Sequence, residues 1–189
     1  MSEMRCVLAG VQLRDDRDFT ERFQETNALC EACGFVTVGT LVQRSRTLDP
    51  NTGLRSGKAA ELAALCRQSS ADIIVLHNNV SAGCAARLAQ LTETEVIDRT
   101  ALILRIFSMR ARTKEARLQT EIARLSYLLP VSTSEDTESH KRGGSYANRG
   151  AGEMRRAQLA SRYRGRIAAL KKELAALERR GMQSEKRRN

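Results

Sequence analysis

The chain has 189 residues, enough for one compact domain with an extended appendage or for two very small domains. Hydrophobic residues make up 41% of it, but aromatic residues make up only 4% and tryptophan is absent, so the core has to be aliphatic. The sequence has no uncharged apolar run long enough to cross a bilayer, and its first ten residues lack the regions of a signal peptide, so we expect a cytoplasmic protein with no membrane partner.

The net charge of +10 is concentrated at one end of the chain. Residues 1–140 carry 17 basic and 18 acidic side chains, whereas residues 141–189 carry 15 basic and 4 acidic ones. A basic block on one element is typical of a protein that binds a polyanion such as RNA. A solvated, disordered tail is the alternative that charge alone leaves open.

The first hundred residues alternate between strand and helix patterns. Short apolar runs predict strands, and apolar residues at helical spacing predict helices between them. Because strands that alternate with helices pair in parallel beneath helices on both faces, residues 1–98 are expected to form a small α/β domain, a parallel sheet flanked by helices. The predicted strands lie at residues 6–11, 35–42, 73–76 and 96–97, and the predicted helices at 15–33, 58–68 and 81–91.

Loops that follow the carboxyl ends of parallel strands carry function in such sheets. Gly57 and Lys58, at a predicted helix start, are a candidate phosphate-binding pair for a nucleotide or RNA, with ordinary helix initiation as the alternative. His77 follows a strand, in the position of a catalytic residue, but no partner nucleophile or acid is visible and a satisfied loop histidine is favoured. The predicted loops are at residues 12–15, 43–57 and 77–79.

Five cysteines are present, and two of them, Cys30 and Cys33, have the spacing of a zinc or redox motif. No second pair of cysteines or histidines follows at ligand spacing, and both residues fall near the end of a predicted helix. We therefore expect free, buried thiols and neither a metal nor another cofactor.

Beyond Asp98 the pattern becomes purely helical. One helix is predicted from Thr100 to Leu129, ended by Pro130, and a second from about Glu153 to Arg180. Heptad spacing predicts that they form a long antiparallel, coiled-coil-like hairpin over residues 99–181, before a basic tail at 182–189. Pairing of the two apolar seams between chains, to form a dimer, is the alternative. The seam residues are Leu118, Ile122, Leu125, Leu129, Tyr163, Ile167, Leu170, Leu174 and Leu177.

A long tip loop is expected between the two helices, at residues 131–152. Its second half combines cations, glycines and one tyrosine, a mixture that suits RNA because cations meet phosphate, glycine permits close approach and tyrosine stacks on a base. The RNA-binding residues predicted from the tip into the second helix are Lys141, Arg142, Gly143, Gly144, Ser145, Tyr146, Asn148, Arg149, Arg155 and Arg156.

The segment from Asp98 to Pro130, with its block Arg110–Gln119 (RARTKEARLQ), closely resembles the stretch that opens the helical part of HflX-type GTPases. Gly57-Lys58 and the glycines of the tip loop fit the same family, and the resemblance covers nearly the whole chain. It implies a ribosome-associated protein whose N-terminal domain and helical hairpin dock on the large ribosomal subunit. In that family the hairpin enters the tRNA region and its tip approaches the peptidyl transferase centre.

By carry-over, the resemblance implies that the Arg110–Gln119 block and the tip loop supply ribosomal RNA contacts, with the tip near the peptidyl transferase centre. Occupancy of that site would exclude tRNA, as in ribosome rescue, splitting or hibernation. The residues carried over are Arg110, Arg112, Lys114 and Arg117, together with the tip residues Arg142 to Arg149.

The departures from the family concern nucleotide chemistry. The sequence has no G-x-x-x-x-G-K-[ST] motif, since Gly53 to Lys58 has three intervening residues and Ala59 follows. The expectation is therefore a ribosome-binding factor that is not an enzyme, released by a trans-acting GTPase or splitting factor. The alternative is a nucleotide-binding α/β enzyme that uses Lys58 and the His77 loop and is tethered to RNA.

The end of the chain leaves two origins open. Asn189 falls about where the family's G domain starts, so the chain is either the N-terminal fragment of a full ribosome-splitting GTPase or a stand-alone paralogue. Ala151 replaces a proline usual in the family, and Met154–Ser161 replaces an acidic stretch. This drift favours the paralogue.

Overall fold

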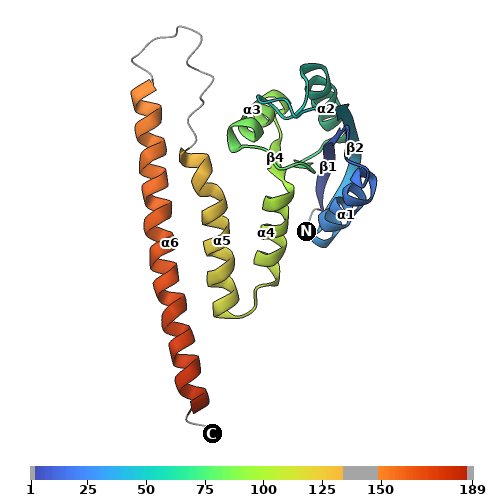
Figure 1. Ribbon diagram of the computed structural model, residues 1–189. Coiled ribbons are helices and arrows are strands. Elements are labelled where there is room, and N and C mark those ends of the chain that lie inside the picture. Colours follow the sequence, from blue (N-terminus) through green and yellow to red (C-terminus); the bar gives the residue numbers. More distant parts are fainter. Residues whose placement is uncertain (1–2, 134–148, 187–189) are drawn as a thin grey trace. The chain divides into compact units, whose positions relative to one another are not determined.

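The computed structural model describes residues 3–133 and 149–186 (Figure 1), with backbone alone at 130–133, 149–153, 155, 156 and 181–186. Contacts divide the chain into two compact units, Met1–Met109 and Arg110–Asn189, called here the first and second units. Within the described residues, no helix combines the length and the apolar character needed to cross a membrane.

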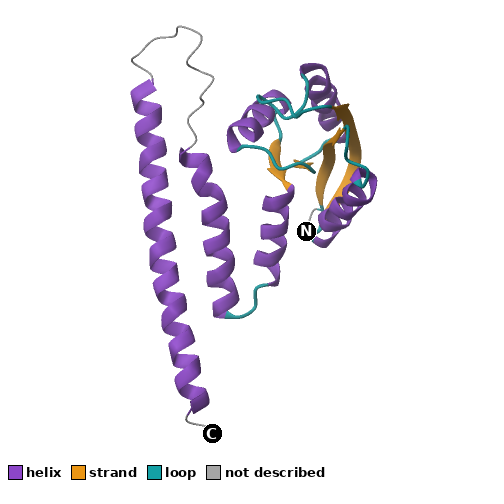
Figure 2. Ribbon diagram, viewed as in Figure 1, coloured by secondary structure: helices purple, strands orange, loops and turns teal. Residues whose placement is uncertain are grey.

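The first unit contains one parallel sheet of four strands in the order β2-β1-β3-β4 (Figure 2). The chain builds outward from β1 to β2 and then returns across β1 to β3, so the strand order reverses between β1 and β3. Such a reversal leaves a crevice at the carboxyl ends of the strands. The strands are β1 (Met4–Leu13), β2 (Phe35–Ser45), β3 (Ile73–Leu76) and β4 (Glu95–Asp98).

Helices cover both faces of this sheet, and alternate residues of β1 face opposite sides. Val7 packs in one core cluster with Leu62 and Leu88, which belong to α2 and α3. Leu8 packs in the other with Leu102, which belongs to α4, and with residues of α1. The helices are α1 (Phe19–Ala32), α2 (Ser56–Ser69), α3 (Ala82–Thr92) and α4 (Arg99–Arg110).

The α/β class and the small parallel sheet flanked by helices are confirmed. Every predicted strand and helix of the first hundred residues is present, and Gly34 ends α1 with a φ of +79° that favours glycine. Ser81 caps α3, because its hydroxyl accepts a hydrogen bond of 3.2 Å from the Cys84 N–H. The expected loop at 43–57 is shorter than predicted, since β2 continues to Ser45.

All five cysteines are free and buried, as expected for Cys30 and Cys33. Burial raises the pKa of the Cys84 thiol to about 11 and also raises that of Cys66, which keeps both protonated at neutral pH. Cys6 differs, because hydrogen bonds to Cys30 and Thr37 lower its thiol pKa to about 7 despite burial. All three of these side chains are inside the core, with no more than 3% exposed.

The second unit consists of α5 (Lys114–Thr133) and α6 (Arg149–Lys186), which lie side by side (Figure 1). The nine predicted seam residues all belong to one apolar cluster. Leu118, Leu125, Ile167 and Leu170 are its buried members, and the other five are partly buried around them. Heptad spacing therefore identified the contact surface between the two helices.

Five helix boundaries in this part of the chain were predicted wrongly. The single helix expected from Thr100 to Leu129 is interrupted at Ala111–Thr113, because the Thr113 hydroxyl accepts a hydrogen bond of 3.1 Å from the Ala116 N–H and begins a new helix. α5 continues past Pro130 to Thr133. Proline removes one backbone hydrogen-bond donor from the helix, but the neighbouring Leu129 packs in the apolar cluster with residues of α6 and stabilises this turn. α6 is longer than expected at both ends.

These differences also change the predicted organisation. The predicted hairpin begins at residue 99 and would therefore include α4. In the structure, Leu102 and Ile106 of α4 are buried in the core of the first unit, so most of α4 belongs to that unit. The predicted tip loop at 131–152 overlaps the end of α5 and the start of α6, and residues 182–186 of the predicted tail are helical. Pro130 misled the prediction at the end of α5, and glycines such as Gly150 misled it at the start of α6, because a helix tolerates a glycine at a cost of about 1 kcal/mol.

Candidate nucleic-acid interface

Two of the predicted RNA-binding arginines lie at the junction of α4 and α5. Arg110 is the last residue of α4 and Arg112 lies in the turn that Thr113 ends. Both side chains are exposed, and neither forms an ion pair with any other described residue. Exposed guanidinium groups without a carboxylate partner are available to bind phosphate.

The other two carried-over cations are engaged within the second unit. Lys114 Nζ lies 2.7 Å from Glu173 Oε1, and both side chains remain largely exposed. Arg117 Nε donates a hydrogen bond of 3.2 Å to the carbonyl oxygen of Ala111, which holds the turn before α5. Surface contacts of this kind are weak enough to exchange for a phosphate.

The exposed part of α6, beside and opposite the seam, carries most of the remaining charge. The seam uses the Tyr163, Ile167 and Leu170 positions, and the cations fall between and beside them. From Ala157 to Arg180 the only acidic residues are Glu173 and Glu178. The exposed cations of this stretch are Arg162, Arg164, Arg166, Lys171, Lys172, Arg179 and Arg180.

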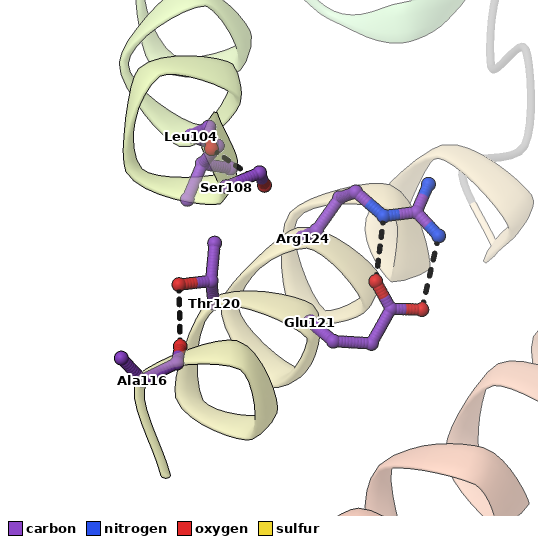
Figure 3. A network of polar contacts seen from close by, with 6 residues as sticks. All are labelled: Leu104, Ser108, Ala116, Thr120, Glu121 and Arg124. Carbon is purple, nitrogen blue, oxygen red and sulfur yellow. Dashed lines mark hydrogen bonds and ion pairs between the residues drawn. The ribbon is translucent and has the colours of Figure 1, made fainter. Parts of the chain in front are cut away.

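One arginine of α5 is fixed by a neighbouring carboxylate instead. Arg124 donates from Nε and from a terminal nitrogen to the two carboxylate oxygens of Glu121, at 3.0 and 3.1 Å (Figure 3). This bidentate pairing lowers the pKa of Glu121 and raises that of Arg124. Arg124 is therefore a poorer candidate for phosphate than Arg110 or Arg112.

The predicted tip residues from Lys141 to Asn148 lie outside the described residues. Of the remaining three, Arg149, Arg155 and Arg156, the backbone belongs to α6, and their side chains are not described. Their assignment to RNA binding stays a prediction.

The first unit has a crevice of about 750 Å³ at the carboxyl ends of its strands, lined in part by His77. His77 is 8% exposed, its Nδ1 lies 2.8 Å from the Thr26 hydroxyl, and its ring meets Phe19 edge-on. Burial, and then the nearby Arg99 and Arg22, lower the pKa of His77. This is the satisfied loop histidine that the sequence favoured, since its polar partner is supplied by α1.

The predicted phosphate-binding pair lies in the first turn of α2. Lys58 Nζ is paired with Glu61 Oε2 at 2.7 Å, one turn further along the helix. Gly57 has open space where a side chain would begin. The pair is accessible, but the lysine charge is already compensated, and its role in phosphate binding stays a prediction.

The sequence analysis missed two groups of cations. The α6 residues from Arg162 to Arg180 belong to the basic block, and the heptad pattern could have identified each of them as a cation at a position outside the seam. The arginines of the first unit gave no such signal, because acidic residues bring the net charge of residues 1–140 close to zero. Several of them meet at the carboxyl ends of β1 and β2.

Comparison with known protein families agrees with this two-part organisation. A family model described as GTP-binding GTPase N-terminal matches residues 20–108, and one described as GTP-binding GTPase Middle Region matches residues 110–188. The boundary between the two matches coincides with the boundary between the two units.

Similar proteins carry the name GTPase HflX. The one from Alkalihalophilus pseudofirmus is 32% identical over 172 residues, which are 90% of this chain and 41% of that protein. The one from Spirochaeta thermophila is 33% identical over 177 residues, 93% of this chain and 43% of that protein. The chain thus spans less than half the length of these relatives.

A solved structure shares the fold. It is a GTP-binding protein from the hyperthermophilic archaeon Sulfolobus solfataricus in complex with GDP, 19% identical, with a TM-score of 0.63 over 93% of this chain and 46% of that one. At this identity the likeness concerns the fold alone.

These relatives correct one expectation. The missing P-loop predicted a protein that is not an enzyme, but the matching proteins are GTPases of which this chain spans 41% and 43%. A motif absent from 189 residues therefore says nothing about the activity of the family. With two family models in tandem over residues 20–188 and HflX relatives along nine-tenths of its length, the chain belongs to the HflX-type GTPase family, and its 189 residues match the N-terminal and middle regions of that family.

Proposed function

We propose that this chain is the ribosome-binding part of an HflX-type GTPase system and acts in the cytoplasm on the large ribosomal subunit. The second unit is an antiparallel helical hairpin that contacts ribosomal RNA and extends toward the tRNA site and the peptidyl transferase centre. Nucleotide control comes from a G domain, whether on the same polypeptide or on a partner.

The order of contacts between α5 and α6 supports the antiparallel arrangement. At the start of α5, Lys114 pairs with Glu173. About two to three turns later, Glu121 and Arg124 lie within the electrostatic influence of Arg166 and Tyr163, respectively, which come earlier in α6. Positions advance along one helix as they retreat along the other, as in an antiparallel pair.

The observation that carries the proposal is the division of the second unit into an apolar seam and a cationic exterior. The nine seam residues pack against one another, and the cations of α6 from Arg162 to Arg180 remain exposed. Exposed arginines and lysines in such excess over carboxylates match a surface made of phosphates. Arg110 and Arg112 extend this surface to the start of the hairpin.

The dimensions of the hairpin support its reach into the subunit. With 20 residues in α5 and 38 in α6, the helices have lengths of about 30 and 57 Å at 1.5 Å per residue. An element of this length that occupies the tRNA site excludes tRNA. The consequence is a role in rescuing, splitting or hibernating ribosomes.

Co-sedimentation with purified large subunits tests the proposal. The full chain is expected to pellet with large subunits at low salt and to be released as salt rises, because phosphate contacts release counterions. Replacing Arg110 and Arg112 together by alanine is expected to release it at lower salt, whereas the control Arg67→Ala, an exposed arginine of α2, is expected to leave the release point unchanged. A chain that stays in the supernatant at low salt contradicts the proposal.

A further inference from the structure

All the charged residues that line a second cavity of the first unit are positively charged. The cavity has a volume of about 610 Å³ and opens at the carboxyl ends of β1 and β2. Arginines are four of its seven lining residues, and no acidic residue lines it. The lining consists of Gln12, Leu13, Arg14, Arg44, Ser45, Arg46 and Arg55.

The parallel pairing of β1 and β2 creates this cluster. In the register of the sheet, Gln12 lies beside Arg44 and Leu13 beside Ser45, so the residues that end the two strands meet at one edge. Arg44 is oriented by this pairing, because its Nε donates a hydrogen bond of 3.2 Å to Gln12 Oε1. Arginines distant in sequence are thus brought together by the sheet.

Arg55 joins the cluster from the loop that follows β2. The Arg55 N–H donates a hydrogen bond of 2.8 Å to Oε1 of Gln43, a β2 side chain that is 4% exposed. Arg55 is also the N-cap residue directly before α2, and the first turn of α2 contains no acidic residue and no side-chain cap. The positive end of the helix dipole therefore adds to the guanidinium charges.

Two of the four arginines, Arg14 and Arg46, also line the neighbouring crevice, whose lining includes Asp15, Asp16 and Asp18. None of the four forms an ion pair within the described residues, although Arg22 and Arg99 in the neighbouring crevice pair with Asp16 and Glu25. Four guanidinium groups around one cavity repel one another unless an anion lies between them. Ser45 adds an unused polar group, since its Oγ is buried without a hydrogen-bond partner in the described structure.

The lining also indicates which kind of anion fits. Arginine forks bind phosphate oxygens in pairs. A free nucleotide needs in addition an aromatic or apolar surface for its base, but Leu13 is the single apolar residue of the lining and no aromatic residue belongs to it. The cavity therefore matches phosphates without recognising a base.

We propose that this arginine-lined cavity binds the phosphate backbone of RNA and gives the first unit an RNA contact of its own. This inference rests on the proposed function, because it takes RNA as the ligand. The arginines that it involves are separate from those of the hairpin. The RNA then engages both units of the chain.

Binding of a fluorescent single-stranded RNA to the full chain, followed by anisotropy at several salt concentrations, tests this site. The variant Arg44→Gln/Arg46→Gln is expected to weaken binding at least 5-fold and to reduce the salt slope by about 1.4, for two lost phosphate contacts. Arg67→Gln is the matched control and is expected to bind as the unaltered chain does. An unchanged affinity and slope in the double variant overturns the inference.

Two further arms make the outcome specific. Tripolyphosphate and ATP are expected to compete with the RNA equally at equal charge, and much stronger competition by ATP overturns the assignment to a phosphate backbone. If Arg110→Gln/Arg112→Gln weakens binding but the cavity variant does not, this inference alone fails, whereas absence of any RNA binding removes the proposed function as well. Protection of Arg44 and Arg46 from phenylglyoxal by RNA, read by mass spectrometry on the unaltered chain, is expected even where a variant folds poorly.

Discussion

Lys114 Nζ and Glu173 Oε1 lie 2.7 Å apart, joining the first residue of α5 to a residue two-thirds of the way along α6. The ammonium group lowers the pKa of the Glu173 carboxyl by hydrogen bonding and by direct attraction. The pair lies beside the apolar seam, so it fixes the register of the two helices more than it adds to their stability.

Reversing this pair tests the register. Lys114→Glu places two carboxylates side by side and is expected to lower the thermal unfolding midpoint of the second unit. The double variant Lys114→Glu/Glu173→Lys is expected to recover most of that loss, because the attraction is restored with its direction exchanged. Circular dichroism melts of the three proteins measure the coupling, and an absence of recovery contradicts the pairing.

Truncation of the seam is expected to be far more costly. Leu125→Ala removes a side chain that is 4% exposed within the apolar cluster and is expected to destabilise the α5–α6 pair by about 2–4 kcal/mol. Leu159→Ala, which alters an α6 leucine that is 40% exposed, is the control and is expected to change stability little. Urea unfolding compares the two; equal losses would show that the seam is not the contact surface.

The break between α4 and α5 depends on one hydroxyl. Thr113→Ala removes the group that accepts the Ala116 N–H and is expected to cost about 1 kcal/mol, while Thr113→Ser keeps it and is expected to cost much less. The order of the two variants in chemical unfolding is the measurement. If the alanine variant is as stable as the serine variant, the cap is not what ends the turn.

The burial of His77 predicts that the stability of the first unit depends on pH. The His77 pKa is lowered in the folded chain, chiefly by burial, so the unfolded chain binds a proton more readily. The stability contributed by neutral His77 is complete above the unfolded pKa of about 6.5 and is lost as pH falls below it. An NMR titration is expected to place the His77 pKa below the value it has in denaturant; a value equal or higher contradicts this environment.

The parts predicted from sequence are those in which one pattern dominates. The continuous apolar run Ile73–Leu76 fits a buried strand, and the heptad spacing of the seam from Leu118 to Leu177 fits helices that pack along one side. The Ala111–Thr113 break was missed because it contains neither glycine nor proline, and a threonine cap looks like any exposed helical threonine.

The arginine-lined cavity was missed for a different reason. Arg14, Arg44 and Arg55 are separated by many residues and are interspersed with acids along the sequence, so their charges cancel in any sum over the chain. Their meeting depends on the register of β1 with β2 and on the hydrogen bond from Arg55 to Gln43, which are properties of the folded sheet.

A cryo-EM map of the chain with purified large ribosomal subunits measures the central claim most directly. The account predicts density for α5 and α6 in the tRNA site, with Arg110 and Arg112 against ribosomal RNA and the first unit in contact with RNA through the Arg44–Arg46 edge. Density for the chain at a site where these residues face solvent or protein, or subunits without bound chain at low salt, would contradict it.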